Sequence, residues 1–318
     1  MKVDKIMSYK IGEYMWLDKR YHSLDYELKK IFGTKVIKLS VDGGFTCPTR
    51  DGFKGYGGCI FCSSRGSGEF SGDRALPIKS QLKNQISLLK EKWPEAKYIV
   101  YFQNFSNTYA DIKTLKEKYD EALEFDNVVG LAIATRGDCL DEDVIKLLKT
   151  YNEKTFLWVE IGLQSIHKHS EEFIRRGYGL KAFDRAISAL NQNNIRTVAH
   201  LILNLPNETK KHYIETLNYL VEKQIWGIKL HMLHILKNTD LESYYKIHPF
   251  DIMELDAYIS LICDLISIIP EEIVIHRLTG DGSKEDLIAP LWSANKRYIL
   301  NGINKELAKR NLTQGCNL

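Results

Sequence analysis

The segment VVGLAIATRGDCLDEDVIKLLKTYNEKTFLWVEIGL (residues 128–163) holds a complete strand–helix–strand unit. Its two ends, VVGLAIAT and FLWVEIGL, are short apolar runs of the kind that forms strands buried on both faces. Between them Val144, Leu147, Leu148 and Tyr151 recur at helical spacing, which predicts an amphipathic helix packed on the sheet. The segment therefore predicts parallel strands joined by a crossover helix.

The same alternation runs through the chain. Further strand-like runs lie at residues 36–42, 98–103, 196–205, 225–235 and 271–278. A helical pattern from Leu82 to Trp93 stops before Pro94, and a last helix is expected at about 293–310. Successive β–α units predict a single-domain α/β fold, a partial or complete parallel β/α (TIM-like) barrel. A doubly wound open sheet is the alternative, because periodicity does not show whether a sheet closes.

We expect three parts in this domain: an N-terminal extension (1–35), a core (36–250) and a C-terminal strand with helices that complete the barrel (251–318).

The chain has 44 Lys and Arg residues and 41 acidic residues, and the net charge of +3 is too small to indicate nucleic-acid binding by itself. No window approaches eighteen uninterrupted apolar residues, so we expect a cytoplasmic protein without a membrane partner.

Three of the six cysteines are crowded into CPTRDGFKGYGGCIFC (47–62), directly after the first predicted strand. Cys47, Cys59 and Cys62 form a C-x11-C-x2-C pattern with four glycines in the longer spacer. Thiolates are ligands for iron–sulfur clusters and zinc. A cubane normally takes four cysteines, so three would leave one iron open to another molecule. The alternative is a structural zinc site completed by a distant His.

The loop resembles the radical S-adenosylmethionine (SAM) superfamily, whose common motif is C-x3-C-x2-C with an aromatic residue before the last cysteine, here Phe61. The x11 spacing, KLSVDGGFTCPTRDG (38–52) and RLTGDG…LIAPLWSANK (277–282 and 287–296) are similar to its YtqA/YhcC-type subgroup. The resemblance implies that the three cysteines hold a [4Fe–4S] cluster. It also implies that SAM binds the open iron and is cleaved reductively to a 5′-deoxyadenosyl radical. The electron would come from an external donor of the flavodoxin or ferredoxin type.

The stretch EIGLQS (160–165) followed by EEFIRRGYG (171–179) resembles a pattern of the coproporphyrinogen-oxidising radical SAM enzymes and the Elongator catalytic subunit. By this resemblance Gln164 would bind the SAM ribose and Arg176 the SAM carboxylate. In the next strand His200 stands where these relatives have an acidic residue that contacts ribose. Without the resemblance, Arg176 would be a charge on a solvated face and His200 a core histidine.

Polar residues at other predicted strand ends are further candidates, because strands of such barrels direct their C-terminal ends to the active site. After the second strand, Gln103, Asn107 and Thr108 could bind the amino and carboxylate groups of SAM, or simply end the strand. Arg136 and Asp138 follow the third strand and could contact substrate or cofactor, or form a local pair that caps the next helix.

Two further groups of residues lie near the ends of the last strands. His231 and His234 are three apart on a predicted strand, hence expected on opposite faces and not in a joint metal site. The end of the seventh strand and its RLTGDG turn offer further polar groups to a substrate: His276, Arg277, Thr279 and Asp281.

The resemblance to the tRNA-acting Elongator subunit favours a tRNA substrate, modified at a wobble uridine or its C5 side chain. Basic clusters could contact phosphates, although solvated helix faces would look the same. They are Lys19 and Arg20 beside Tyr21, and Lys296, Arg297, Lys305, Lys309 and Arg310. A radical enzyme acting on a small molecule such as a tetrapyrrole, and a non-enzymatic iron–sulfur or zinc protein, are the alternatives.

Overall fold

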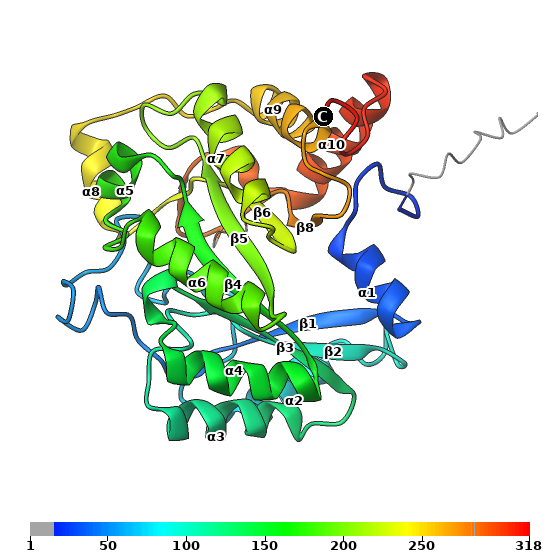
Figure 1. Cartoon of the computed structure of the whole chain (residues 1–318). Coiled ribbons are helices and arrows are strands. Elements are labelled where there is room, and N and C mark those ends of the chain that lie inside the picture. Colours follow the sequence, from blue (N-terminus) through cyan, green and yellow to red (C-terminus); the bar gives the residue numbers. More distant parts are fainter. Residues whose placement is uncertain (1–15, 281, 283) are drawn as a thin grey trace, which may run out of the picture.

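The computed structural model describes residues 16–280, 282 and 284–318, and seven parallel strands form its central sheet. Their order follows the chain, β1-β2-β3-β4-β5-β6-β8, and every neighbouring pair is parallel. The strands are β1 (Val36–Val41), β2 (Lys97–Phe102), β3 (Val128–Thr135), β4 (Phe156–Gln164), β5 (Arg196–Leu203), β6 (Gly227–Met232) and β8 (Val274–Arg277). The sheet curls into a half-barrel (Figure 1), which confirms the partial barrel predicted from the sequence.

Helices between the strands cover the outer face of the curled sheet (Figure 1), where their apolar residues form the main core. All α-helices of the described chain have these bounds: α1 (Leu24–Phe32), α2 (Ile78–Ser87), α3 (Ile112–Leu123), α4 (Glu142–Lys154), α5 (Lys168–Ile174), α6 (Leu180–Gln192), α7 (Lys210–Glu222), α8 (Asp240–Ile247), α9 (Leu255–Ser267) and α10 (Lys296–Lys309). Short elements are β7 (Ile235–Leu236), β9 (Leu287–Ala289) and the 3-10 turns η1 (Gly137–Cys139) and η2 (Leu291–Ala294). None of the helices in the described ranges is long and apolar enough to cross a membrane.

Helix α1 occupies the gap between the two edge strands of the half-barrel. Ser23 forms a parallel bridge with Ile275 of β8, and the Ile275 N–H donates to the carbonyl of His22 at 2.7 Å. Leu28 packs on the inner face of the sheet in a cluster that includes Val36 of β1 and Trp158 of β4. Strands β1 and β8 are not paired with each other in the described part of the chain, so the sheet stays open. Helix α1 lies in the opening between these two strands.

Two sequence expectations about element lengths were wrong. Helix α2 ends at Ser87, and residues 88–92 form turns. Leu89 still packs against the core, but it does so from these turns, whereas Trp93 is 38% exposed. The run at 225–235 is divided into β6 and the short β7, which pairs with β9 in a separate antiparallel ribbon.

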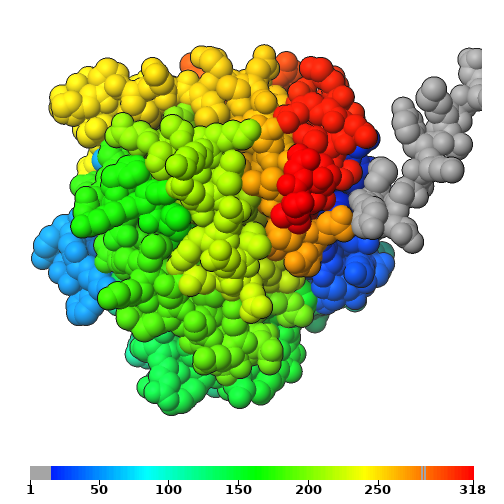
Figure 2. All heavy atoms as spheres, turned by 45° about the horizontal axis from the view of Figure 1, so that its top comes forward, coloured from blue at the N-terminus to red at the C-terminus, as the bar shows by residue number. Residues whose placement is uncertain are grey.

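The two ends of the described chain lie side by side. The side chain of Gln314 accepts from the N–H of His22 at 2.8 Å, and the Gln314 N–H donates to the carbonyl of Arg20 at 2.9 Å. In Figure 2 the red C-terminal atoms adjoin the blue atoms near the start of the described chain. Arg20 and the C-terminal end of α10 therefore lie near this junction, and no residue of the two basic clusters lines the main cavity.

Candidate active site

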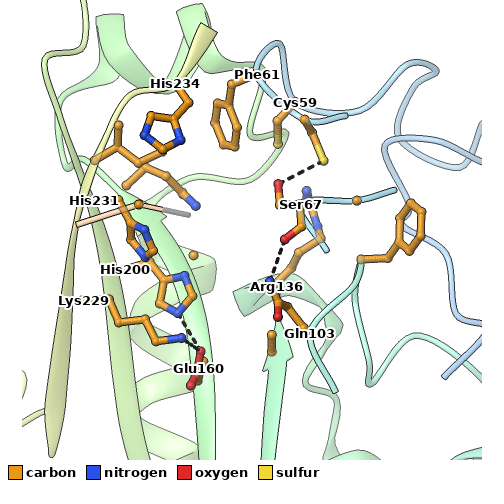
Figure 3. A pocket seen from close by; sticks show the side chains of 18 of the residues that line it. Cys59, Phe61, Ser67, Gln103, Arg136, Glu160, His200, Lys229, His231 and His234 are labelled. Atoms are coloured by element: carbon orange, nitrogen blue, oxygen red, sulfur yellow. Dashed lines mark hydrogen bonds and ion pairs between the residues drawn. The ribbon is translucent and has the colours of Figure 1, made fainter. Parts of the chain in front are cut away.

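A cavity of about 240 Å³ lies inside the half-barrel, and strand ends and the cysteine loop surround it. Strand β1 leads into the cysteine loop, so the fold brings this loop to the C-terminal edge where barrel enzymes place their chemistry. Figure 3 shows a row of basic side chains on one wall and the cysteine loop on the other. The lining includes Cys47, Cys59, Cys62, Gln103, Arg136, Glu160, Gln164, Arg176, His200, Lys229, His231, His234 and Arg277.

The cysteine loop is held by its own backbone hydrogen bonds. The N–H groups of Arg50 and Gly58 donate to the carbonyls of Cys47 and Thr49 at 2.8 and 2.9 Å. The Arg50 guanidinium donates to the carbonyl of Cys62 at 3.0 Å, and Cys47 Sγ lies 3.1 Å from Ser106 Oγ. These bonds tie the distant ends of the C-x11-C spacer together, so the three thiols border one cavity.

Burial favours the protonated thiols of Cys47 and Cys59. Burial raises the pKa of Cys59 to about 12. It also raises the pKa of Cys47, against the opposing effects of Ser106 and Arg136. Among the residues that the structure describes, no three His, Cys, Asp or Glu side chains are gathered so as to hold a single metal ion.

The floor of the cavity is a buried ionic network around Glu160 of β4, which is fully buried. Its Oε1 accepts from Trp158 Nε1 at 2.9 Å and lies 3.7 Å from Lys38 Nζ. Its Oε2 accepts from His200 Nε2 at 2.9 Å and pairs with Lys229 Nζ (Figure 3). Burial by itself would raise the pKa of Glu160, but these ammonium groups hold it well below its usual range. Glu160 is thus an ionised acceptor.

The same network determines the protonation of His200. Burial, and next the positive charge of Lys229, lower the pKa of His200 to about 4. The ring is therefore neutral in the folded chain at neutral pH. Because its Nε2 donates to the ionised Glu160, its Nδ1 carries no proton and is an acceptor.

For this reason the free energy of unfolding should decrease as the solution becomes more acidic. An unfolded histidine takes up a proton near pH 6.5, whereas folded His200 does so only near pH 4. The depressed folded-state pKa contributes about 3 kcal/mol that is present above pH 6.5 and is lost as the pH falls from 6.5 towards 4. Urea unfolding measured between pH 7.5 and 4.5 should show this loss, and a His200→Gln variant should show a flatter profile. An equal slope in both proteins would contradict the assignment.

Arg176 is not on a solvated face, since it is only 1% exposed and borders the cavity. Its Nε donates to the carbonyl of Tyr178 at 2.8 Å, and its Nη1 donates to that of Ser165 at 2.9 Å. Nη2 pairs with Glu171 at 2.7 Å. The guanidinium therefore holds the end of β4 together. Gln164, at that end, borders the same cavity with a φ of 62°, a strained conformation for a residue other than Gly.

The residues after β2 and β3 divide between cavity and interior. Gln103 and Arg136 line the cavity. Asn107 and Thr108 do not: Asn107 Nδ2 donates to the carbonyls of Phe102 and Ala134 at 3.0 and 2.8 Å, and Thr108 bonds to Thr135. Both side chains are buried and join strand ends, so the structure does not support direct contact with SAM for this pair.

Arg136 forms a two-point ion pair with Asp138, Nε to Oδ1 at 2.9 Å and Nη2 to Oδ2 at 3.0 Å. The local Arg–Asp pair considered from the sequence thus exists, but helix α4 is capped by Asp141, which accepts from the Val144 N–H. Arg136 lines the cavity, whereas Asp138 does not and also pairs with Lys54 at 2.6 Å.

Of the four candidates at the end of β8 and in the turn after it, Arg277 lines the cavity. The His276 ring packs against Trp158 and Trp226 with centroids 5.5 and 4.9 Å away, and Thr279 donates to the carbonyl of Gly280. Asp281 lies outside the described residues.

The placement of His231 and His234 on opposite faces was wrong. Strand β6 ends at Met232, so the alternation of faces stops between the two residues, and both line the cavity (Figure 3). The rings of His231 and His200 lie 5.2 Å apart, and His231 Nε2 has no hydrogen-bond partner among the described residues.

Sequence reasoning missed the cavity floor itself: Lys38, Tyr101, Glu160 and Lys229. A signal was present, because each of the three charged residues interrupts an otherwise apolar strand. A buried charge in a strand needs a partner, and three such strands in one sheet indicate a shared network.

Comparison with known proteins agrees with this geometry. Residues 55–220 match the Radical SAM superfamily, and residues 225–309 match the Radical_SAM C-terminal domain. The chain is 43% identical to YtqA of Bacillus subtilis over 94% of its own length and 92% of that protein. It is 33% identical to YhcC of Escherichia coli K12, covering 89% of this chain and 90% of that one.

More distant relatives share the fold. Elongator complex protein 3 of Schizosaccharomyces pombe is 25% identical over 68% of this chain and 39% of its own. The solved structure of Methanocaldococcus infernus Elp3 superposes with a TM-score of 0.67 at 16% identity, over 88% of this chain and 64% of that chain. Streptococcus suis SuiB bound to S-adenosylmethionine superposes with a TM-score of 0.52 at 11% identity, over 81% and 54%. The chain belongs to the radical SAM superfamily, in the YtqA/YhcC-type subgroup, and is an enzyme that uses a [4Fe–4S] cluster and SAM.

Proposed function

We propose that Cys47, Cys59 and Cys62 are the protein ligands of the [4Fe–4S] cluster. All three thiols border one cavity, on a loop with several glycines at positive φ. A cubane takes each thiolate on a separate iron, so its ligands need not meet at one point as the ligands of a single zinc ion must. Cys139 is buried and is not part of the cavity lining.

Cluster binding has to displace the protons that burial favours on Cys47 and Cys59. The guanidinium groups of Arg50 and Arg136 favour the thiolate form of Cys47, and Ser106 Oγ can donate to it. When bound, the cluster supplies the electron that cleaves SAM to methionine and a 5′-deoxyadenosyl radical. That electron comes from an external donor, for which we propose a flavodoxin or ferredoxin type.

The SAM site is proposed to include Gln164, Arg176, His200 and Gln103. Each lines the cavity that the cysteines border. His200 is suited to a ribose hydroxyl, because its unprotonated Nδ1 can accept the hydroxyl proton. Arg176 has one remaining Nη2 proton beyond its protein partners, which is available to a carboxylate.

Arg176→Ala should weaken SAM binding about ten- to a hundredfold, the effect of losing a charged hydrogen bond. Since Arg176 also holds the end of β4, Gln164→Gly is the companion variant: Gly accepts the φ of 62° without strain, and the lost amide should weaken binding about two- to tenfold. Calorimetric titration of SAM into the cluster-loaded variants measures both. Unchanged affinity in both variants, with intact clusters, would refute the proposed site.

For the substrate we propose a tRNA, modified at a wobble uridine or its C5 side chain. The observation that carries this proposal is the polar wall opposite the cysteines, where Arg277, His231 and His234 border the cavity. Such groups can bind the edge of an unstacked base, and a base in a single-stranded loop can enter a cavity. The sequence and fold relationship to Elongator complex protein 3 supports the same class.

The test compares the nucleosides of bulk tRNA, by mass spectrometry, from cells with and without the protein. A wobble-uridine derivative should change in cells without it, and expression of the wild-type chain, but not of Cys59→Ala, should restore the profile. An identical profile in both strains would refute the tRNA proposal. It would favour a small molecule such as a tetrapyrrole, which an Arg at this place would also bind.

A further inference from the structure

The spacer between Cys47 and Cys59 presents two aromatic rings to solvent. Phe53 is 73% exposed and Tyr56 is 82% exposed. The backbone beneath them is bonded, with the Lys54 N–H donating to the carbonyl of Pro48 at 2.6 Å and the Gly52 N–H to that of Gly55 at 3.1 Å. The rings are thus exposed on a defined turn. In Figure 2 this light-blue region stands out from the body of the molecule.

A basic groove begins beside this turn, at Lys54. Its charged lining residues are Lys54, Lys168, Glu171, Lys181 and Arg185. The one acid among them, Glu171, is neutralised by Arg176 at 2.7 Å. Lys54 and Lys168 have acidic partners, so the positive charge available in the groove comes mainly from Lys181 and Arg185.

Lys181 and Arg185 lie four residues apart in α6, and both are exposed. Neither forms an ion pair with any residue that the structure describes. Like charges at this spacing repel each other on a helix, so an anionic ligand between them would relieve the repulsion. Tyr178 lines both this groove and the main cavity, so the groove lies next to the site of chemistry.

We infer that the exposed aromatic turn and the basic groove together bind a single-stranded segment of RNA. Sites for single strands combine cations that follow the phosphates with aromatic rings on which bases stack, and both are present here. Phosphates would lie along Lys181 and Arg185, and bases would stack on Phe53 and Tyr56. An acidic electron-donor protein could also bind the cations, but it does not call for two exposed rings. The identity of the RNA as a tRNA rests on the proposed function, whereas the assignment of this surface to RNA binding does not.

The experiment measures binding of a fluorescent, unmodified 17-nucleotide anticodon stem-loop to the cluster-loaded full chain by anisotropy. Phe53→Ala/Tyr56→Ala should weaken binding about tenfold or more, because each stacked base contributes strongly to affinity. Lys181→Glu/Arg185→Glu should weaken it to a similar degree. It should also flatten the slope of log affinity against log salt by about 1.4, for two lost phosphate contacts on a single strand.

Lys79→Glu/Lys83→Glu on α2 is the matched control, because the two residues are exposed, lie four residues apart like Lys181 and Arg185, and line neither cavity. It should bind RNA like the wild type. All variants should cleave SAM with dithionite in the absence of RNA at the wild-type rate, which shows that they are folded and loaded.

Equal RNA affinity of the wild type and both surface variants would overturn the inference. A second result would also overturn it: the surface variants keep their RNA affinity and cleave SAM with dithionite, but no longer cleave SAM with a flavodoxin. The surface would then bind the electron donor. Cellular tRNA separates this from the proposed function. If the profile depends on the protein but the surface variants restore it fully, the inference fails alone. If the profile does not depend on the protein while the stem-loop still needs the surface, the proposed function fails alone.

Discussion

Replacing any one of Cys47, Cys59 and Cys62 with Ala is expected to abolish the broad visible absorbance of the cluster and all formation of 5′-deoxyadenosine. Three thiolates hold three of the four irons and leave the fourth open for SAM, so the loss of one removes an anchor for which the described lining of the cavity offers no substitute thiol. Anaerobic reconstitution, followed by iron and sulfide analysis and a SAM-cleavage assay with dithionite, measures both effects.

Cys263→Ala is the control for this series. Cys263 is fully buried in α9, and its thiol contacts the carbonyl of Ile303 at 3.7 Å, far from the cavity lining. It should retain iron and SAM cleavage. Stoichiometric zinc without iron in the reconstituted wild type, or SAM cleavage in any of the three loop variants, would refute the ligand assignment.

Glu160→Gln is expected to lower the free energy of unfolding by about 3–5 kcal/mol, the usual cost of removing one partner from a buried ion pair. Glu160 is the acceptor for Lys229, Lys38, His200 and Trp158 at the cavity floor. The amide keeps the shape but leaves the two ammonium groups without a counter-charge at a buried position. Urea unfolding of the wild type and the variant by circular dichroism measures the difference.

The double variant Glu160→Gln/Lys229→Met tests whether charge is the cause. Replacing a buried ion pair with neutral groups of similar size is often nearly neutral for stability, so the double variant should recover part of the loss. If the Glu160→Gln variant is as stable as the wild type, the ionic network does not stabilise the cavity floor. A double variant as unstable as Glu160→Gln would assign the loss to packing.

Local patterns predicted the strands and most helices correctly. Each of the two apolar ends in residues 128–163 forms a strand, and Val144, Leu148 and Tyr151 are buried on one face of α4. Such patterns are read within a few residues of the chain, so they survive without tertiary information. Helix α2 is shorter than its apolar spacing predicted, because Leu89 reaches the core from the turns that follow the helix.

The cavity floor could not be predicted residue by residue, although its charges were visible. Lys38, Glu160 and Lys229 come from β1, β4 and β6, separated by more than sixty residues at each step. Only the strand order and the curl of the sheet bring their side chains together. Arg176 shows the reverse case, because without the family resemblance its sequence position suggested a solvated face, yet tertiary contacts bury it against the end of β4.

The sequence by itself determined the α/β class, the parallel order of strands and the grouping of three thiols after β1, since each depends on neighbours along the chain. Only the tertiary structure decided that α1 fills the open edge, that Glu160 meets two lysines, and that the aromatic turn adjoins the groove beside α6. These features depend on contacts between segments distant in the chain, which form only when the sheet curls and its elements pack.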